Sequence, residues 1–348
     1  MVIFAAIRIL IIFALSFVVA LIITPVVFGF LKKFNLRKNN IRDEASAPTF
    51  HHFHKDKSST PTMGGIIIWA TVLLLALIFF VFSKLFDGFS EYFNFVNRAE
   101  TYLPIAALFL SALVGLADDM LGILKIGPHG GGLTMKYKLL LYGCVAALGA
   151  WWFYFRLDWH TLFVPFIGTV DLGLWYIPFF IFVIVATAFS ANEADGLDGL
   201  LGGTMFFSFS AIVAVAFVLH RYDLAVMCAS ILGALLAFLW FNIYPAKFFM
   251  GDTGSMSLGI TLGVTAMLTN TPLLLPFFGF ILVVESVSVI IQVLSKKFRK
   301  KKIFLSTPIH HHFEALGWPE SQITMRFWII SAIMAIFGIA VFFLARFV

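Results

Sequence analysis

Long apolar runs separated by short polar connections dominate the pattern along this chain. Ten segments are apolar over roughly the 20 residues that an α-helix needs to cross the hydrocarbon core of a bilayer. They are predicted at residues 3–30, 65–83, 103–117, 138–157, 174–191, 201–219, 224–243, 257–272, 273–294 and 325–346. The eighth and ninth are poorly separated around Asn270, Thr271 and Pro272. The pattern predicts an all-α, polytopic membrane protein with about ten transmembrane helices in one bundle.

Composition supports the same class. Of the 348 residues, 61% are hydrophobic and 12% are charged, whereas soluble domains have about 25% charged residues. No internal repeat or linker divides the sequence, so residues 1–348 are expected to form a single integral-membrane domain. Cys144 and Cys228 both lie inside apolar runs, and neither a disulfide nor a cysteine metal site is predicted.

Positive charge gathers in alternate connections. The odd-numbered connections hold sixteen of the Lys and Arg residues and the even-numbered ones hold four; the odd-numbered connections are residues 31–64, 118–137, 192–200, 244–256 and 295–324. Because Lys and Arg favour the cytoplasmic side, these connections are predicted to be cytoplasmic and both termini extracytoplasmic. Topology and contacts with anionic membrane lipids then explain the net charge of +6, with a role in holding an anionic substrate as the alternative, and no nucleic-acid partner is expected.

Acidic motifs lie in the same odd-numbered connections. Asp118 and Asp119 end the third predicted span, and such a pair can bind a divalent cation or deprotonate a nucleophile. Between Asn192 and the sixth predicted span, Asp195 and Asp198 are each followed by glycine. That run suits binding of a metal, a sugar or a base, and the alternative is a polar turn that caps the next helix.

The run from Asn242 to Ser255 is the longest polar signature. Its glycines permit a sharp turn into a helix N-terminus, which is a favourable place for phosphate, and Asp252 offers a carboxylate to Mg²⁺. Phe249 could stack on a nucleobase, although packing against lipid or core is the commoner role of an isolated Phe in such a composition.

Histidines form a third kind of motif. The triplet at 310–312 resembles a zinc site, but consecutive residues of a helix point to different faces. Hydrogen bonding to phosphate or hydroxyl groups is therefore the better interpretation. A second group of histidines, at residues 51–54, is more typical of a solvated basic loop.

In this order, the motifs resemble those of the phospho-N-acetylmuramoyl-pentapeptide transferases. The resemblance covers essentially the whole chain and rests on TPTMGG at 60–65, the Asp pair at 118–119, DGLDG at 195–199, FNIYPAKFFMGDTGS at 241–255 and PIHHHFE at 308–314. DGLDG alone is shared by the wider superfamily of polyprenyl-phosphate N-acetylhexosamine-1-phosphate transferases. The extended Gly-Asp run together with the histidine triplet is much more specific to the muramoyl-pentapeptide branch.

The resemblance implies a bacterial enzyme of the cytoplasmic membrane, usually a homodimer, with ten transmembrane helices and an active site that faces the cytoplasm. Such an enzyme transfers phospho-MurNAc-pentapeptide from UDP-MurNAc-pentapeptide to undecaprenyl phosphate, with Mg²⁺ as cofactor. The products are lipid I and UMP, in the first membrane step of peptidoglycan synthesis. The sister activity, GlcNAc-1-phosphate transfer, is the alternative. A transporter is disfavoured because charge inside the predicted spans is scarce, with Glu285 the main exception.

The resemblance also assigns roles. Asp252 becomes the Mg²⁺ ligand, and Asp118 deprotonates the lipid phosphate or, in a two-step scheme, attacks the pyrophosphate itself. Asp119 assists in placing the metal or the substrate. The other implied substrate-binding residues are Lys57, Thr62, Asn192, Asp195, Asp198, Asn242, Phe249, Gln292, His310, His311 and His312.

Two places depart from the family pattern. Glu193 and Ala194 stand where the family usually has a hydrophobic residue followed by Thr. Gly122 stands where family members often carry a Lys one turn after the Asp pair, and neither Lys125 nor Lys138 is assigned a role.

Overall fold

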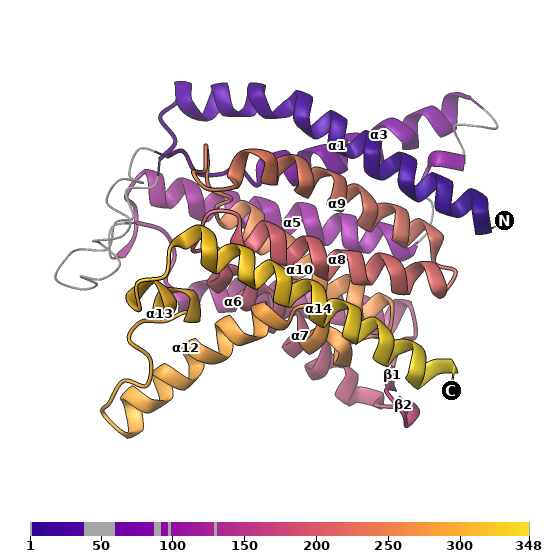
Figure 1. The fold of residues 1–348 in the computed structure, drawn as a ribbon. Helices are drawn as coiled ribbons and strands as arrows, with labels where there is room; N and C mark the ends of the chain where they lie inside the picture. The colour runs from indigo at the N-terminus through magenta and orange to yellow at the C-terminus, as the bar shows by residue number, and fades with distance from the viewer. Residues whose placement is uncertain (1, 38–59, 87–91, 97–98, 129–130, 348) are drawn as a thin grey trace.

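Long helices lie side by side in one bundle (Figure 1). The structure is a computed structural model, and it describes residues 2–37, 60–86, 92–96, 99–128 and 131–347. The start of the first helix and the end of the last lie at the same end of the bundle, as does a small β-hairpin. A short helix after the basic segment lies at the other end.

The helices account for nearly all of the regular structure. They are α1 (Val2–Lys33), α3 (Ile66–Leu85), α5 (Ala99–Ile123), α6 (Met135–Arg156), α7 (Tyr176–Ala194), α8 (Leu200–Val218), α9 (Tyr222–Asn242), α10 (Asp252–Leu268), α11 (Leu275–Phe278), α12 (Phe280–Phe298), α13 (Ile309–Ala315) and α14 (Glu320–Phe347). The short 3-10 helices η3 (Gly173–Trp175) and η4 (Pro272–Leu274) precede α7 and α11.

A two-stranded hairpin is the exception to the predicted all-α class. Strands β1 (Thr161–Val164) and β2 (Gly168–Asp171) pair antiparallel, with Thr161 opposite Asp171. Four residues per strand give too short an alternation to stand out beside long apolar runs, which is why the sequence did not indicate it. The fold is therefore nearly all-α.

The helices make this a polytopic membrane protein. Within the described residues, eight helices are long and apolar enough to cross a membrane. The pair Pro272–Phe278 and Phe280–Phe298 would count as a ninth span, but it is bent by 91° at Gly279. Helix α10 corresponds to the predicted eighth span and has 17 residues, slightly fewer than the roughly 20 that usually cross a bilayer core. The expected number of ten spans stays a prediction.

Helix α10 is the buried centre of the bundle. All 17 of its residues are buried, and it packs mainly against α5 and α7. Some of its hydroxyl side chains bond within the helix, as when Ser257 Oγ donates to the Thr253 carbonyl at 2.7 Å, whereas Thr253 Oγ1 donates to the Ala112 carbonyl of α5 at 2.9 Å. Glycine allows the closest approach, because a Cβ on Gly115 of α5 would lie 2.3 Å from the Asp252 carbonyl oxygen. This contact brings the start of α10 against the last turns of α5.

Helix α5 is longer than the apolar pattern predicted. It continues to Ile123, so Asp118 and Asp119 lie inside the helix and not beyond its end at residue 117. The apolar run stops at the two aspartates, but partners from other helices compensate their charge and the helical backbone continues.

Candidate active site

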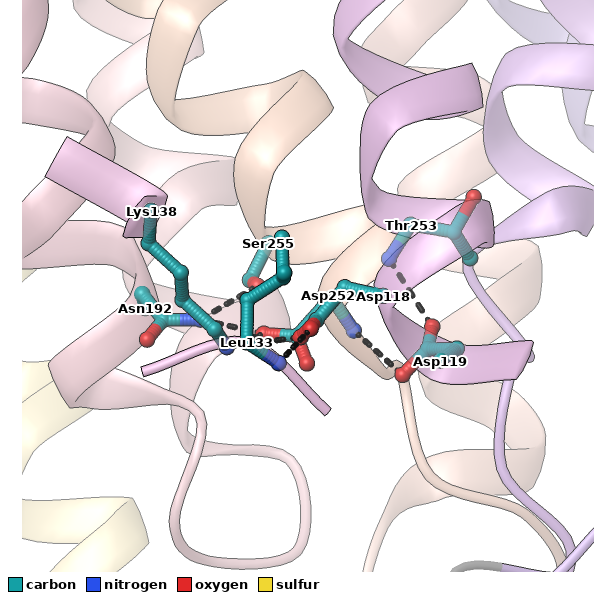
Figure 2. Close-up of polar contacts among 8 residues, drawn as sticks. All are labelled: Asp118, Asp119, Leu133, Lys138, Asn192, Asp252, Thr253 and Ser255. Carbon is teal, nitrogen blue, oxygen red and sulfur yellow. Dashed lines mark hydrogen bonds and ion pairs between the residues drawn. The ribbon is translucent and has the colours of Figure 1, made fainter. Parts of the chain in front are cut away.

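Two carboxylates from distant parts of the sequence meet at one lysine (Figure 2). Lys138 Nζ, from α6, lies 2.9 Å from Asp118 Oδ2 on α5 and 2.8 Å from Asp252 Oδ1 at the start of α10. The three side chains are only 12%, 1% and 8% exposed, respectively. The sequence singled out both aspartates, whereas it assigned no role to Lys138.

Further donors fix the two carboxylates. Asn192 on α7 donates through Nδ2 to Asp252 Oδ1 at 2.5 Å and to Ser255 Oγ at 3.4 Å. The backbone N–H of Leu133 donates to Asp118 Oδ1 (Figure 2). Helices α5, α6, α7 and α10 therefore all contribute to one polar cluster, which we call the carboxylate cluster: Asp118, Lys138, Asn192 and Asp252.

Asp119 has a different environment from its neighbour. Its Oδ1 accepts from the backbone N–H of Asp252 at 3.1 Å, and its Oδ2 accepts from that of Thr253 at 3.0 Å. The first N–H groups of a helix lack partners within the helix, and negative charge is favoured at a helix N-terminus. Asp119 thus caps α10 from a different helix and holds Asp252 beside α5.

The carboxylate cluster fits a small divalent cation. Among the described residues, two carboxylates face one ammonium here, which leaves net negative charge, and Asp118 Oδ2 has no hydrogen bond with good geometry. Mg²⁺ is commonly held by one or two carboxylates together with phosphate and water oxygens. The described residues contain no group of three or more His, Cys, Asp or Glu that could hold a metal. Asp252 would therefore hold the ion together with substrate phosphates and water, with the Asp118 carboxylate beside it.

The histidine triplet on α13 does not converge on one point. The Nδ1 atoms of His310, His311 and His312 lie 3.0 Å from Glu285 Oε2, 2.6 Å from Glu314 Oε2 and 3.2 Å from the backbone nitrogen of Leu305, respectively. Each ring has its own partner, so the described triplet does not form a shared metal site.

A buried ion pair joins α12 to α13. Glu285 and His310 are both 0% exposed, and a Cβ on Gly196 would lie 2.2 Å from His310 Nε2. Burial disfavours the charged imidazole, but the Glu285 carboxylate outweighs it and raises the pKa of His310 above its usual value. Glu285, the one acidic residue that the sequence placed inside a span, is therefore the partner of the histidine segment, which packs against the DGLDG run.

Two side-chain amides that the sequence predicted to bind substrate make hydrogen bonds to backbone groups. Asn242 Oδ1 accepts from the Gly199 N–H at 3.0 Å, and its Nδ2 donates to the Phe248 carbonyl at 2.9 Å. Gln292 holds Phe304 through both ends of its amide, with Nε2 2.8 Å from the carbonyl oxygen and Oε1 3.1 Å from the backbone nitrogen. Both side chains are buried and shape the walls of the connections around the site.

The connection before α3 pairs with the connection before α10. The Phe249 N–H donates to the Pro61 carbonyl and the Gly64 N–H donates to the Phe249 carbonyl, both at 2.8 Å. Thr62 is buried in this pairing, and Phe249 is half-buried. The TPTMGG and Gly-Asp motifs are thus brought together, whereas Lys57 lies outside the described residues.

The DGLDG run, residues 195–199, is linked by hydrogen bonds to the connection before α10 and to the start of α14. Asp198 is buried, its Oδ2 accepts from the Ala246 N–H at 3.0 Å, and its own N–H donates to Glu320 Oε1 at 2.6 Å. Asp195 is half-buried. Asp198 therefore holds this loop in place through its hydrogen bonds. The side chain of Asp195 is more exposed than that of Asp198.

Two residues of α6, Lys138 and Tyr142, belong to the surroundings of the carboxylate cluster although the sequence did not predict them. Tyr142 lies one helical turn after Lys138 and is 1% exposed. Its hydroxyl has no hydrogen-bond partner among the described residues. The available signal was weak, because Lys138 was one of two lysines near the start of an apolar helix with no motif around it.

Comparison with known proteins agrees with the motif pattern. The profile of glycosyl transferase family 4 matches residues 101–270. A relative from Clostridium novyi (strain NT), named phospho-N-acetylmuramoyl-pentapeptide-transferase, is 39% identical over 328 residues, covering 93% of each chain. Proteins of the same name from Geobacillus sp. (strain WCH70) and Chloroflexus aggregans are 36% and 35% identical, covering 93% and 96% of this chain and 95% and 89% of their own. The chain therefore belongs to the phospho-N-acetylmuramoyl-pentapeptide transferase family.

Proposed function

We propose that this protein transfers phospho-MurNAc-pentapeptide from UDP-MurNAc-pentapeptide to undecaprenyl phosphate. Family membership supports the reaction class, and the observation that carries the proposal is the buried meeting of Asp118 and Asp252 at Lys138. A phosphate oxygen of the lipid attacks the sugar-bearing phosphorus, and the bond to the UMP oxygen breaks. Lipid I and UMP are the products.

The central difficulty of this reaction is that both substrates are anions. A bound Mg²⁺ would neutralise the pyrophosphate and stabilise the charge that develops on UMP. Asn192 orients the Asp252 carboxylate toward that ion, and Lys138 balances part of the charge of Asp252 and Asp118. Asp118 takes the proton of the lipid phosphate, which makes the attacking oxygen more nucleophilic.

The surroundings suit an anionic donor that arrives from water and an acceptor held in lipid. The basic segment 296–302, which runs from the last turn of α12 into the connection to α13, is exposed and would attract the nucleotide. We place this end of the bundle in the cytoplasm of a bacterial cell and the helices in its cytoplasmic membrane, as a homodimer.

Product analysis on the purified full chain tests the function. With undecaprenyl phosphate, UDP-MurNAc-pentapeptide and Mg²⁺, we expect equal amounts of UMP and lipid-linked product. Omission of either the lipid or Mg²⁺ should abolish both products, and Asp252→Asn serves as the inactive control. Turnover of UDP-N-acetylglucosamine, without turnover of UDP-MurNAc-pentapeptide, would contradict the proposal and favour the sister activity.

A further inference from the structure

A pocket lies at the opposite end of the bundle from the carboxylate cluster. Its volume is about 510 Å³, within the range of roughly 300–1,000 Å³ of small-molecule sites. The hairpin, the turn between α8 and α9, and the ends of α10 and α14 form its walls. Because it includes Asn270, just beyond α10, it is about 25 Å from Asp252 at 1.5 Å per helical residue.

The lining of this pocket is positively charged. It contains Arg221 and Arg346, and no carboxylate is among its lining residues. The Arg221 guanidinium lies 5.0 Å from the centre of the Trp159 ring, and its Nη1 is 3.2 Å from Glu100 Oε1. Arg346 lies 5.6 Å from the ring of Phe163 and has no acidic partner in the part of the chain that the structure describes. The pocket therefore carries uncompensated positive charge.

The walls of the pocket are held in place before any ligand arrives. Asn270 Oδ1 accepts from the Phe163 N–H at 2.9 Å, which ties β1 to the end of α10. Because this bond uses the amide oxygen, the Asn270 N–H groups remain as donors beside the two guanidinium groups. A rigid set of N–H donors with positive charge is the arrangement that recognises phosphate oxygens.

Exposed aromatic and apolar side chains at this end of the bundle indicate the depth of lipid headgroups. Trp151, Trp152 and Trp175 are 47%, 40% and 77% exposed, and Phe166 and Ile167 at the tip of the hairpin are 71% and 77% exposed. Tryptophan concentrates at the interface between bilayer and water, where lipid phosphates lie. We propose that this pocket binds the phosphate of an anionic phospholipid headgroup, independently of the reaction at the carboxylate cluster.

Lipid titration of the full chain tests the proposal, with Arg346→Gln as the test variant and Arg156→Gln as the control. Arg156 is an exposed arginine at the same end, 5.8 Å from the Trp151 ring, and it does not line the pocket. Phosphatidylglycerol is titrated into each protein in zwitterionic detergent, and bound lipid is counted by native mass spectrometry. We expect Arg346→Gln to weaken phosphatidylglycerol binding about tenfold, through loss of one charge-assisted contact, and Arg156→Gln to change it less than about twofold.

Two further arms identify the source of the phosphate. Phosphatidylcholine tests whether the net charge of the lipid matters, and inorganic phosphate tests whether a free anion suffices. Equal binding by wild type and Arg346→Gln, or equal weakening by Arg156→Gln, would overturn the site. Displacement of phosphatidylglycerol by inorganic phosphate at equal concentration would overturn the assignment to a lipid. Monodisperse elution and unchanged thermal unfolding of both variants show that they are folded.

Discussion

The two ends of the bundle differ in how the charged side chains in the protein interior are paired. At the hairpin end, Arg8 Nη1 of α1 lies 2.8 Å from Asp223 Oδ1 of α9, so that one cation faces one anion. At the other end, Asp118 and Asp252 face the single ammonium of Lys138. Among the partners that the structure describes, the first arrangement is balanced, whereas the second retains negative charge that a divalent cation can neutralise. Burial alone does not separate a structural ion pair from a ligand site, but the balance of charge does.

The largest expected effect follows from Asp252→Asn. The amide keeps the shape of the side chain but removes the charge that would hold the metal, and we expect turnover to fall by about 10³-fold or more. UMP release at saturating substrates measures it. The matched change at the balanced end, Asp223→Asn, should lower thermal stability while the folded fraction retains its turnover. Equal loss of turnover in both variants would contradict the distinction between the two ends.

Lys138→Met should reduce turnover by about 10²-fold, because two neighbouring carboxylates then lose their common partner. The affinity for Mg²⁺ should not fall with turnover, since the site becomes more negative when Lys138 is removed. We therefore expect the Mg²⁺ concentration for half-maximal UMP release to stay equal or decrease. An increase in that concentration would show that Lys138 helps to build the metal site and does not merely balance it.

Glu285→Gln tests the buried pair with His310 through its dependence on pH. The pKa of His310 is raised in the folded protein, so the stabilisation is complete below the unfolded pKa of about 6.5 and is lost as pH rises through the folded value. Removing one partner of a buried pair costs about 3 kcal/mol. Thermal unfolding should therefore separate wild type from variant most at pH 6 and least at pH 9. The same difference at both pH values would contradict a titration of the His310–Glu285 pair between them.

The smallest effect is expected from removal of the whole balanced pair. Arg8→Met together with Asp223→Leu replaces both charges by apolar groups, which should change stability by less than about 1 kcal/mol. Arg8→Met alone should destabilise more than the double variant, by about 1–3 kcal/mol, because it removes the cation that faces the partly buried Asp223 carboxylate. Chemical or thermal unfolding compares the three proteins, and turnover of the double variant should remain within about twofold of wild type.

The general architecture could be predicted because its signals are local. Apolar runs and alternating basic connections are read directly from the sequence, and they indicated most of the helices and the shared end of the acidic motifs. The bend at Gly279 and the hairpin at 161–171 were not predicted. Both depend on how a short segment packs against its neighbours, which hydropathy averaged over a helix length does not report.

The chemistry of individual side chains was less accessible from sequence. Asp118 and Asp119 are adjacent and look equivalent, but successive helical residues differ by about 100° in direction. One carboxylate therefore faces Lys138 and the other caps α10. Lys138 joined the site only because the start of α6 lies beside the last turns of α5 and the start of α10, a relation that no spacing within the sequence encodes.

Manganese binding followed by electron paramagnetic resonance tests the central claim most directly, since Mn²⁺ is a spectroscopic substitute for Mg²⁺. The purified full chain is titrated alone and after Asp252→Asn, with Asp223→Asn as the charge-matched control. We expect one Mn²⁺ per folded chain, at least about tenfold weaker binding after Asp252→Asn, and unchanged binding in the control. Equal affinity in wild type and Asp252→Asn would contradict the assignment of the carboxylate cluster as the metal site.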